Sequence, residues 1–318
     1  MSNNSFARTR SEFDLAEWLA MKIAIDSGIR LWCDIDGVGL IPDGDSMRAK
    51  PTLLLMHGGP GSDHSAFKPA FDAMTDVCQV VYYDHRGQGR SDKSTPDNWN
   101  LSRWADDAVE LCNALGIEKP FVLGNSFGGF VAQRMASRHP GFAQAYIFNS
   151  TRSDNDRSAM YVMFEKLGGQ EAHDAARTFW EASSEAEMAK AAMQYLKICG
   201  PLYTQSRMNP FEGNRAVRST DVLTHYNQNE GPALNLLPEL AKVQDPVLVI
   251  TGEMDPVTPA SDAEQTVKAL PQHLVQFERF ANAGHGVYRD EPERYFEVLK
   301  AFVNAHSSAL PAAKVIGD

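Results

Sequence analysis

Short apolar runs alternate with longer helical patterns along most of the chain, and this alternation constrains the fold more than any other feature. Runs of four to seven residues that are bounded by turn residues predict strands, and they cover residues 22–26, 30–34, 52–56, 77–83, 121–124, 145–149, 246–251 and 274–280. Helical patterns cover residues 102–115, 127–139, 260–269 and 293–305. Strands that alternate with helices form right-handed crossovers, so the sequence predicts an α/β fold with a mostly parallel central sheet flanked by helices.

One long stretch interrupts this alternation. From about residue 151 to 236 the strand patterns disappear, and helical patterns cover residues 159–167, 172–182 and 185–199. Insertions at the carboxyl edge of a parallel sheet overhang the ligand crevice. We therefore expect a core made of residues 1–150 and 237–318, with residues 151–236 as a helical cap.

Charge and cysteine usage exclude several classes of protein. The 318 residues include 30 Lys and Arg against 41 Asp and Glu, a formal net charge of −11. Such an acidic chain lacks the clustered positive charge that binds nucleic acid or an anionic membrane. Its four cysteines form no CxxC pair, and no apolar run approaches the roughly 20 residues of a membrane span. We expect a cytoplasmic protein, without a signal peptide, that acts on a small molecule.

The segment Gly124-Asn125-Ser126-Phe127-Gly128 follows a predicted strand and opens a predicted helix. This is the context in which a G-x-S-x-G pattern places a nucleophilic serine on a sharp turn. The two glycines are needed because Cβ atoms at these positions would collide with neighbouring backbone. The sequence therefore predicts Ser126 as a nucleophile rather than part of an ordinary glycine-rich turn.

A serine hydroxyl needs a general base, and the base needs a third group that fixes its tautomer. His285 follows the last predicted strand and is flanked by Gly284 and Gly286, which favours it as the base. Asp255 follows the preceding strand and is the predicted acid, with Glu253 as the alternative. The chain order Ser126, Asp255, His285 is the one expected for a nucleophile on such a turn.

Acyl transfer also needs hydrogen-bond donors for the oxyanion. One predicted donor is the backbone N–H of Phe127, directly after the nucleophile, and the other is that of Gly59 in the His57-Gly-Gly-Pro-Gly61 loop. No Lys-Ser or Lys-Thr follows this loop, so a nucleotide-binding P-loop is disfavoured. This chemistry requires neither a metal nor a cofactor.

These motifs, together with Tyr83-Asp-His-Arg-Gly-Gln-Gly-Arg-Ser91, resemble those of the α/β-hydrolase superfamily and, within it, of the proline iminopeptidase-like group. The resemblance covers residues 50–150 and 240–305. It implies an α/β-hydrolase fold and a serine hydrolase that uses a Ser-His-Asp triad and an acyl-enzyme. It further implies an aminopeptidase or amidase that holds a free amine with carboxylates.

The chain departs from that group in two places. Pro256 stands after the acid where a second amine anchor is expected, and the nucleophile is not set in Gly-Gly-Ser-Trp-Gly. Carboxylates of the cap are the remaining candidates for the anchor, namely Glu181, Glu212 and Glu230, of which Glu230 ranks first. Each is otherwise a solvated charge. Trp180 and Phe211 are candidates for an apolar substrate pocket, and are otherwise cap core.

Two other functions stay open. A carboxylesterase or lactonase uses the same triad and needs no amine anchor. A non-catalytic binding protein on the same fold normally lacks a triad residue, and here all three are present. The sequence does not determine the oligomeric state.

Overall fold

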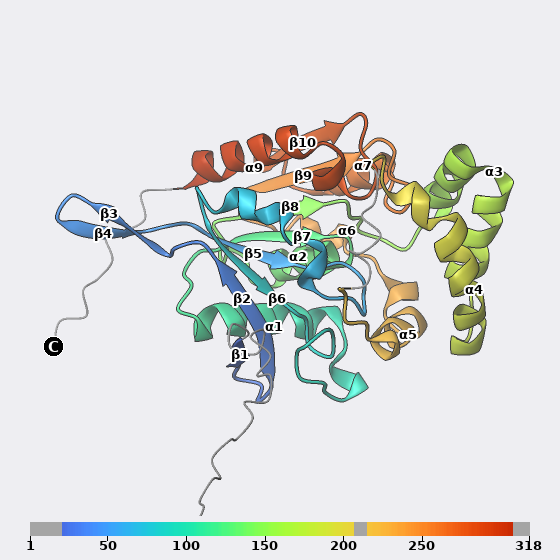
Figure 1. The fold of residues 1–318 in the computed structure, drawn as a ribbon, viewed down its shortest axis with the longest axis horizontal. Coiled ribbons are helices and arrows are strands. Elements are labelled where there is room, and N and C mark those ends of the chain that lie inside the picture. Colours follow the sequence, from blue (N-terminus) through green and yellow to red (C-terminus); the bar gives the residue numbers. More distant parts are fainter. Residues whose placement is uncertain (1–20, 207–214, 308–318) are drawn as a thin grey trace, which may run out of the picture.

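The computed structural model describes residues 21–206 and 215–307. Its centre is an eight-stranded sheet in the order β1-β2-β6-β5-β7-β8-β9-β10 (Figure 1). The strands of this sheet are β1 (Met21–Ala24), β2 (Arg30–Asp36), β5 (Thr52–Met56), β6 (Gln79–Tyr83), β7 (Phe121–Asn125), β8 (Ala145–Asn149), β9 (Val247–Gly252) and β10 (Val275–Phe280). β2 pairs antiparallel with β1 and β6, and the strands from β6 to β10 are parallel. The predicted α/β fold with a mostly parallel sheet is confirmed.

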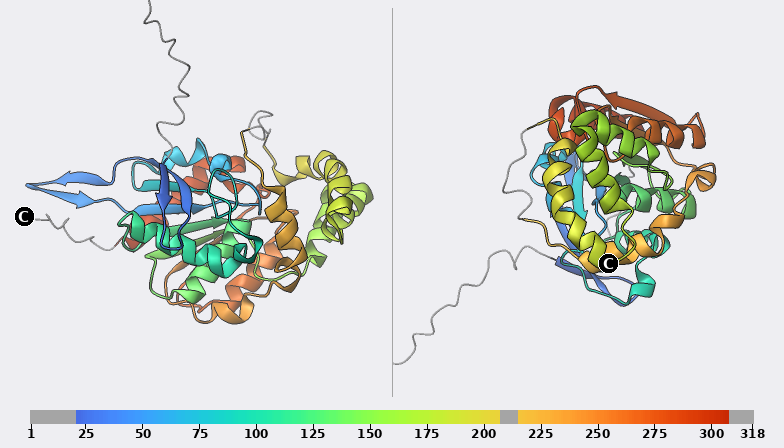
Figure 2. Two further views of the ribbon diagram at one scale, coloured as in Figure 1. Left: turned by 90° about the horizontal axis from the view of Figure 1, so that it is seen from below. Right: turned by 90° about the vertical axis from the view of Figure 1, so that its right-hand side faces the viewer.

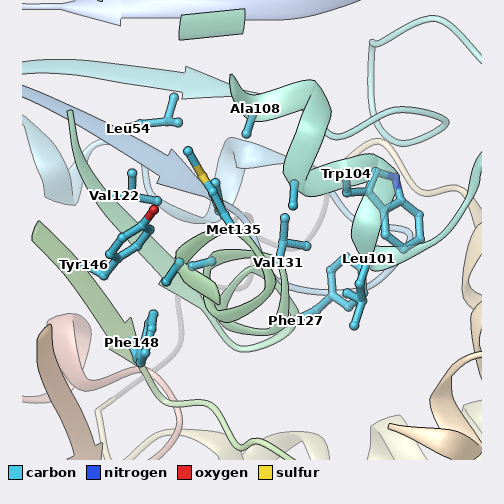
Figure 3. Packing of buried hydrophobic residues seen from close by; sticks show 14 of the residues in the cluster. Leu54, Leu101, Trp104, Ala108, Val122, Phe127, Val131, Met135, Tyr146 and Phe148 are labelled. Atoms are coloured by element: carbon cyan, nitrogen blue, oxygen red, sulfur yellow. The ribbon is translucent and has the colours of Figure 1, made fainter. Parts of the chain in front are cut away.

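Helices cover both faces of this sheet. The α-helices of the described residues are α1 (Leu101–Ala114), α2 (Phe127–Arg138), α3 (Ser158–Trp180), α4 (Glu185–Ile198), α5 (Thr220–Gln228), α6 (Leu237–Leu240), α7 (Ala260–Ala269), α8 (Val287–Asp290) and α9 (Pro292–His306), of which α3 and α4 do not cover the sheet. Side chains alternate between the faces along each strand. Leu54 and Val122 pack with α1 and α2 (Figure 3), whereas Leu53 and Phe121 belong to the core cluster that includes α9.

The sequence explains why α1 forms where it does. Trp104, Ala108 and Leu111 recur at helical spacing, and all three are fully buried. The side chain of Asn100 caps the first turn by accepting a 2.9 Å hydrogen bond from the backbone N–H of Arg103. Gly116 follows the last turn with φ +65°, a conformation that glycine adopts without a Cβ penalty.

The long stretch without strands is helical, as predicted. α3 and α4 pack against each other between β8 and β9 in chain order, with the short helix η5 (Gly200–Tyr203) after them, and we call α3, α4 and η5 the cap helices. They have an apolar core of their own, which includes Phe164, Phe179 and Tyr195. α3 is broken at Gly169, where φ is 71° and ψ is −172°. The cap helices stand at one end of the molecule in two nearly perpendicular views (Figures 1 and 2).

A hairpin of β3 (Leu40–Asp43) and β4 (Ser46–Ala49) was not predicted. It projects from the end of the molecule opposite the cap helices (Figures 1 and 2). Its residues show no apolar alternation because they contact little of the core, and Leu40 and Met47 are exposed. In the part of the chain that the structure describes, no helix is long and apolar enough to cross a bilayer.

Candidate active site

Ser126 lies on the turn between β7 and α2 and has the backbone angles φ 54° and ψ −119°. Few residues other than glycine adopt a positive φ, and strain of this kind concentrates at functional sites. The turn is possible because its flanking residues are glycines. A Cβ on Gly124 would stand 2.3 Å from the Gly128 carbonyl oxygen, and one on Gly128 would stand 2.1 Å from the Met56 carbonyl oxygen. The predicted steric reason for the two glycines is thus found in the geometry.

Asp255 and His285, which are 30 residues apart in the chain, meet beyond the ends of β9 and β10. His285 Nδ1 is 2.9 Å from Asp255 Oδ2. The Asp255 carboxylate is fully buried and accepts hydrogen bonds from the backbone N–H groups of Val257 and Thr258 and from the Thr258 hydroxyl, at 2.8, 3.0 and 2.9 Å. A carboxylate held in this way fixes the imidazole with Nδ1 protonated and Nε2 free to accept a proton.

The alternative acid, Glu253, has a different partner. Its carboxylate pairs with the exposed guanidinium of Arg279, and this contact lowers the pKa of Glu253. Among the described residues the Ser126 hydroxyl has no hydrogen bond, so the structure joins His285 to Asp255 but not to Ser126. Hydrogen bonds to a nucleophile are often long without substrate and tighten in the Michaelis complex.

The loop after β5 approaches the nucleophile closely. A Cβ on Gly58 would stand 3.3 Å from the Ser126 Cβ. Gly59 has φ +137°, where an added Cβ would also crowd the backbone nitrogens of Gly61 and Ser62. The backbone N–H of Gly61 donates a 2.6 Å hydrogen bond to Gln88 Oε1. The loop therefore passes close to Ser126 and to the start of α2.

The buried side chain of His57 holds this loop through hydrogen bonds to the backbone. His57 Nε2 accepts a 3.1 Å hydrogen bond from the backbone N–H of His85, so the neutral ring carries its proton on Nδ1 and donates it to the Gly58 carbonyl at 2.8 Å. Burial lowers the pKa of His57, which keeps the ring neutral. His57 thus fixes the chain direction at Gly58.

The cap helices contact the histidine loop directly. The backbone carbonyl of Tyr203 accepts a 2.7 Å hydrogen bond from the His285 N–H. The two rings meet edge to face with centroids 5.5 Å apart. The Tyr203 hydroxyl is 2.5 Å from the Tyr195 hydroxyl, which also accepts a 3.1 Å hydrogen bond from Trp180 Nε1. Hydrogen bonds therefore link Trp180 and Tyr195 to the Tyr203 hydroxyl, and Tyr203 contacts the candidate base through its ring and its backbone carbonyl.

The predicted substrate-binding residues do not gather at one place. Glu230 Oε2 accepts a 2.7 Å hydrogen bond from the backbone N–H of Leu101, and so caps α1. The exposed Glu181 pairs with Arg177 at 3.1 Å. Trp180 packs with Phe179 and Tyr195 in the cap core. Phe211 and Glu212 lie outside the described residues.

Sequence reasoning missed a charged group at the carboxyl edge of the sheet. Arg152 and Arg157 follow β8, and Arg152 Nη1 lies 3.7 Å from Asp262 Oδ2. Burial raises the pKa of Asp262 to about 7. The position of the two arginines directly after a predicted parallel strand could have identified them, because the carboxyl ends of parallel strands lie at the edge where ligands bind.

Comparison with known proteins gives the same fold. A family model described as alpha/beta hydrolase fold matches residues 51–292. The chain is 27% identical over 276 residues to a proline iminopeptidase of Clostridium botulinum, covering 82% of this chain and 92% of that protein. It is 26% identical over 254 residues to 3-oxoadipate enol-lactonase 1 of Acinetobacter baylyi, covering 77% and 86%. A solved structure of proline iminopeptidase from Mycobacterium smegmatis aligns with a TM-score of 0.68 at 20% identity, covering 90% and 98%.

Proposed function

Since the chain belongs to the α/β-hydrolase fold family, we propose that it is a serine hydrolase that cleaves small carboxylic esters, lactones or amides through a covalent acyl-enzyme. Its catalytic residues are Ser126, His285 and Asp255. The observation that carries the proposal is the hydrogen bond of 2.9 Å between His285 Nδ1 and the fully buried Asp255, at the edge of the sheet where the strained Ser126 turn also lies.

The first half of the reaction forms the acyl-enzyme. The Ser126 hydroxyl gives its proton to His285 Nε2 while its oxygen bonds to the substrate carbonyl carbon. The negative charge that develops on the carbonyl oxygen is held by the backbone N–H groups of Gly59 and Phe127. His285 then returns the proton to the leaving oxygen or nitrogen as the bond to carbon breaks.

The second half releases the acid. Water gives a proton to His285 and its oxygen attacks the acyl carbon, and collapse of the second tetrahedral intermediate returns the proton to Ser126. Asp255 stays ionised throughout and stabilises the imidazolium that forms in each half. Removal of either oxyanion donor is expected to cost about 3–4 kcal/mol of transition-state stabilisation.

The proposal is tested by comparing two substrate sets on the purified protein. One set contains short-chain p-nitrophenyl esters, and the other contains prolyl and alanyl p-nitroanilides with free amines. Ser126→Ala serves as the blank for both. Hydrolysis that this variant retains in full would contradict the proposed nucleophile.

An aminopeptidase is the second candidate, and the similarity to the Clostridium botulinum proline iminopeptidase favours it. That activity requires carboxylates to hold the substrate's amine. Glu230 is engaged by Leu101, Glu181 is engaged by Arg177, and Pro256 provides no carboxylate. For this reason we place esters and lactones first, and a kcat/KM that favours the free-amine anilides would reverse that order.

A further inference from the structure

Two arginines lead from the sheet into the cap beside the nucleophile. The Thr151 hydroxyl donates a 2.8 Å hydrogen bond to the Ser126 carbonyl, so the chain that leaves β8 passes directly by the nucleophile. Arg152 is the next residue and is 7% exposed. Arg157 stands just before the first turn of α3. Arg152 and Arg157 therefore lie on the segment that leads from beside the nucleophile into α3.

Arg152 forms a long ion pair with an acid that is partly protonated. Arg152 Nη1 donates to the backbone carbonyl of Asp156 at 3.0 Å, and the Asp262 carboxylate is 3.7 Å away. Asp262 Oδ2 is buried without a hydrogen bond from any described residue. Burial raises the pKa of Asp262 to about 7, so this acid is only partly ionised at neutral pH. Asp154 and Asp156 also lie within electrostatic reach of this pair.

Arg157 has fewer charged and hydrogen-bonding partners than Arg152. The Arg157 Nε atom is buried and has no hydrogen-bond partner in the described part of the chain. Arg157 also forms no salt bridge with a described residue. The guanidinium lies over the Trp180 ring, with Cζ 5.4 Å from the ring centroid. Burial and the charge of Arg152 both lower the pKa of Arg157. Arg157 itself is half-buried, and a guanidinium whose Nε is buried without a partner favours an anionic ligand.

Tyr226 supplies a third polar group without a partner. It is 4% exposed, and its hydroxyl has no hydrogen-bond partner among the described residues. Its hydroxyl lies within the electrostatic reach of Glu230, Arg152, Arg157 and Arg134. Its ring packs edge to face on Phe127, the residue that follows the nucleophile, with centroids 5.3 Å apart.

We propose that Arg157, with Arg152 and the Tyr226 hydroxyl, binds a carboxylate carried by the substrate, so that the preferred substrates are acidic esters or lactones. This inference rests on the proposed hydrolase function. A planar carboxylate matches the paired N–H groups of a guanidinium.

A matched pair of esters tests this preference. Mono-p-nitrophenyl adipate carries a terminal carboxylate, and p-nitrophenyl hexanoate has the same chain length without it. We expect Arg157→Gln to lower kcat/KM for the adipate ester about tenfold or more, as for loss of a charge-assisted hydrogen bond, and to change that for the hexanoate ester less than about twofold. Arg157→Lys should recover part of the loss.

Arg48→Gln is the matched control, because it removes an exposed arginine from the β3–β4 hairpin at the opposite end of the molecule (Figure 1). It should leave the ratio of the two rates unchanged. An equal loss on both esters in Arg157→Gln, or no preference for the adipate ester in the wild-type protein, would overturn the inference.

A binding measurement separates this inference from the proposed function. In the Ser126→Ala background, adipate should raise Tm and hexanoate should not, and Arg157→Gln should abolish the adipate effect. If the wild-type protein cleaves no ester but adipate still stabilises it through Arg157, the hydrolase proposal fails and the carboxylate site stands. If esters are cleaved and adipate changes neither Tm nor rate, the hydrolase proposal stands and the carboxylate site is refuted.

Discussion

The backbone carbonyl of Tyr203 accepts a 2.7 Å hydrogen bond from the backbone N–H of His285, so the cap helices hold the loop that carries the candidate base. The close approach needs Gly284, where an added Cβ would stand 2.6 Å from the same carbonyl oxygen. The Tyr203 ring also borders the imidazole edge to face. Tyr203 therefore helps to position His285 in addition to Asp255.

Replacing Tyr203 tests that positioning. Tyr203→Ala removes the ring that borders His285, and we expect kcat to fall about tenfold or more with little change in KM. Tyr203→Phe keeps the ring and loses only the hydroxyl contact with Tyr195, so it should stay within about threefold of the wild-type kcat. Steady-state kinetics on one ester measure both, and equal rates for the Ala variant and the wild-type protein would refute the role.

The backbone strain at Ser126 should lower the stability of the folded protein. Ser126→Gly should unfold with a free energy about 1 kcal/mol higher than Ser126→Ala, because only glycine adopts φ 54° without strain. Both variants lack the nucleophile, so activity does not confound the comparison. Denaturant unfolding followed by circular dichroism gives the difference, and equal midpoints would mean that the turn stores no strain.

The two acids of the loop after β9 should behave differently. Asp255→Asn leaves His285 in the wrong tautomer, and we expect kcat to fall about 10³-fold or more while the fold persists. Glu253→Gln loses only an exposed pair with Arg279 and should stay near wild type. The reverse order of effects, measured on the same ester, would assign the acid to Glu253.

Asp262 predicts a pH dependence of stability. Its pKa is about 7 in the folded protein against an ordinary value of 3.8, so the folded state binds the proton more tightly than the unfolded state. The contribution of this group is therefore complete below about pH 4, declines as the pH rises to about 7, and is lost above it. The groups that face Asp262 are Arg152, Asp154, Asp156 and Asp255.

Asp262→Asn isolates this contribution. The free energy of unfolding of the variant, relative to wild type, should increase between pH 5 and 7 and become constant above about pH 8. Urea unfolding at each pH measures it. A difference that does not change with pH would show that Asp262 has an ordinary pKa.

Glu230 distinguishes a structural role from an amine-binding role. Glu230→Ala removes the acceptor for the Leu101 N–H, and we expect the free energy of unfolding to fall by about 1 kcal/mol, as for other lost helix caps. Turnover of esters should be unaffected. A rise in KM for free-amine substrates, with stability unchanged, would instead support the amine-binding role predicted from the sequence.

Local chemistry accounts for what the sequence predicted. The turn at Ser126 depends partly on the steric limit between Gly124 and the Gly128 carbonyl, which acts within five residues. The strands of the eight-stranded sheet and the helices α1, α2, α7 and α9 follow from the spacing of apolar residues. Such features are readable because sequence neighbours decide them.

The remaining features depend on residues far apart in the chain. Glu230 and Leu101 are 129 positions apart, and no local pattern distinguishes a capping carboxylate from a solvated one. The same holds for Arg157, whose environment comes from Trp180 at the far end of α3 and from Tyr226 on α5. The β3–β4 hairpin contributes little to the core and therefore has no apolar periodicity to detect.

β8 and β9 are neighbours in the sheet, yet 97 residues separate the end of one from the start of the other. Their register, Tyr146 opposite Val247 through Asn149 opposite Ile250, is made by the strands themselves. The helices between them can therefore be exchanged or shortened without shifting that register. For protein engineering, α3 and α4 are a replaceable module. The inserted segment must still provide a residue that contacts the His285 backbone N–H and ring, as Tyr203 does.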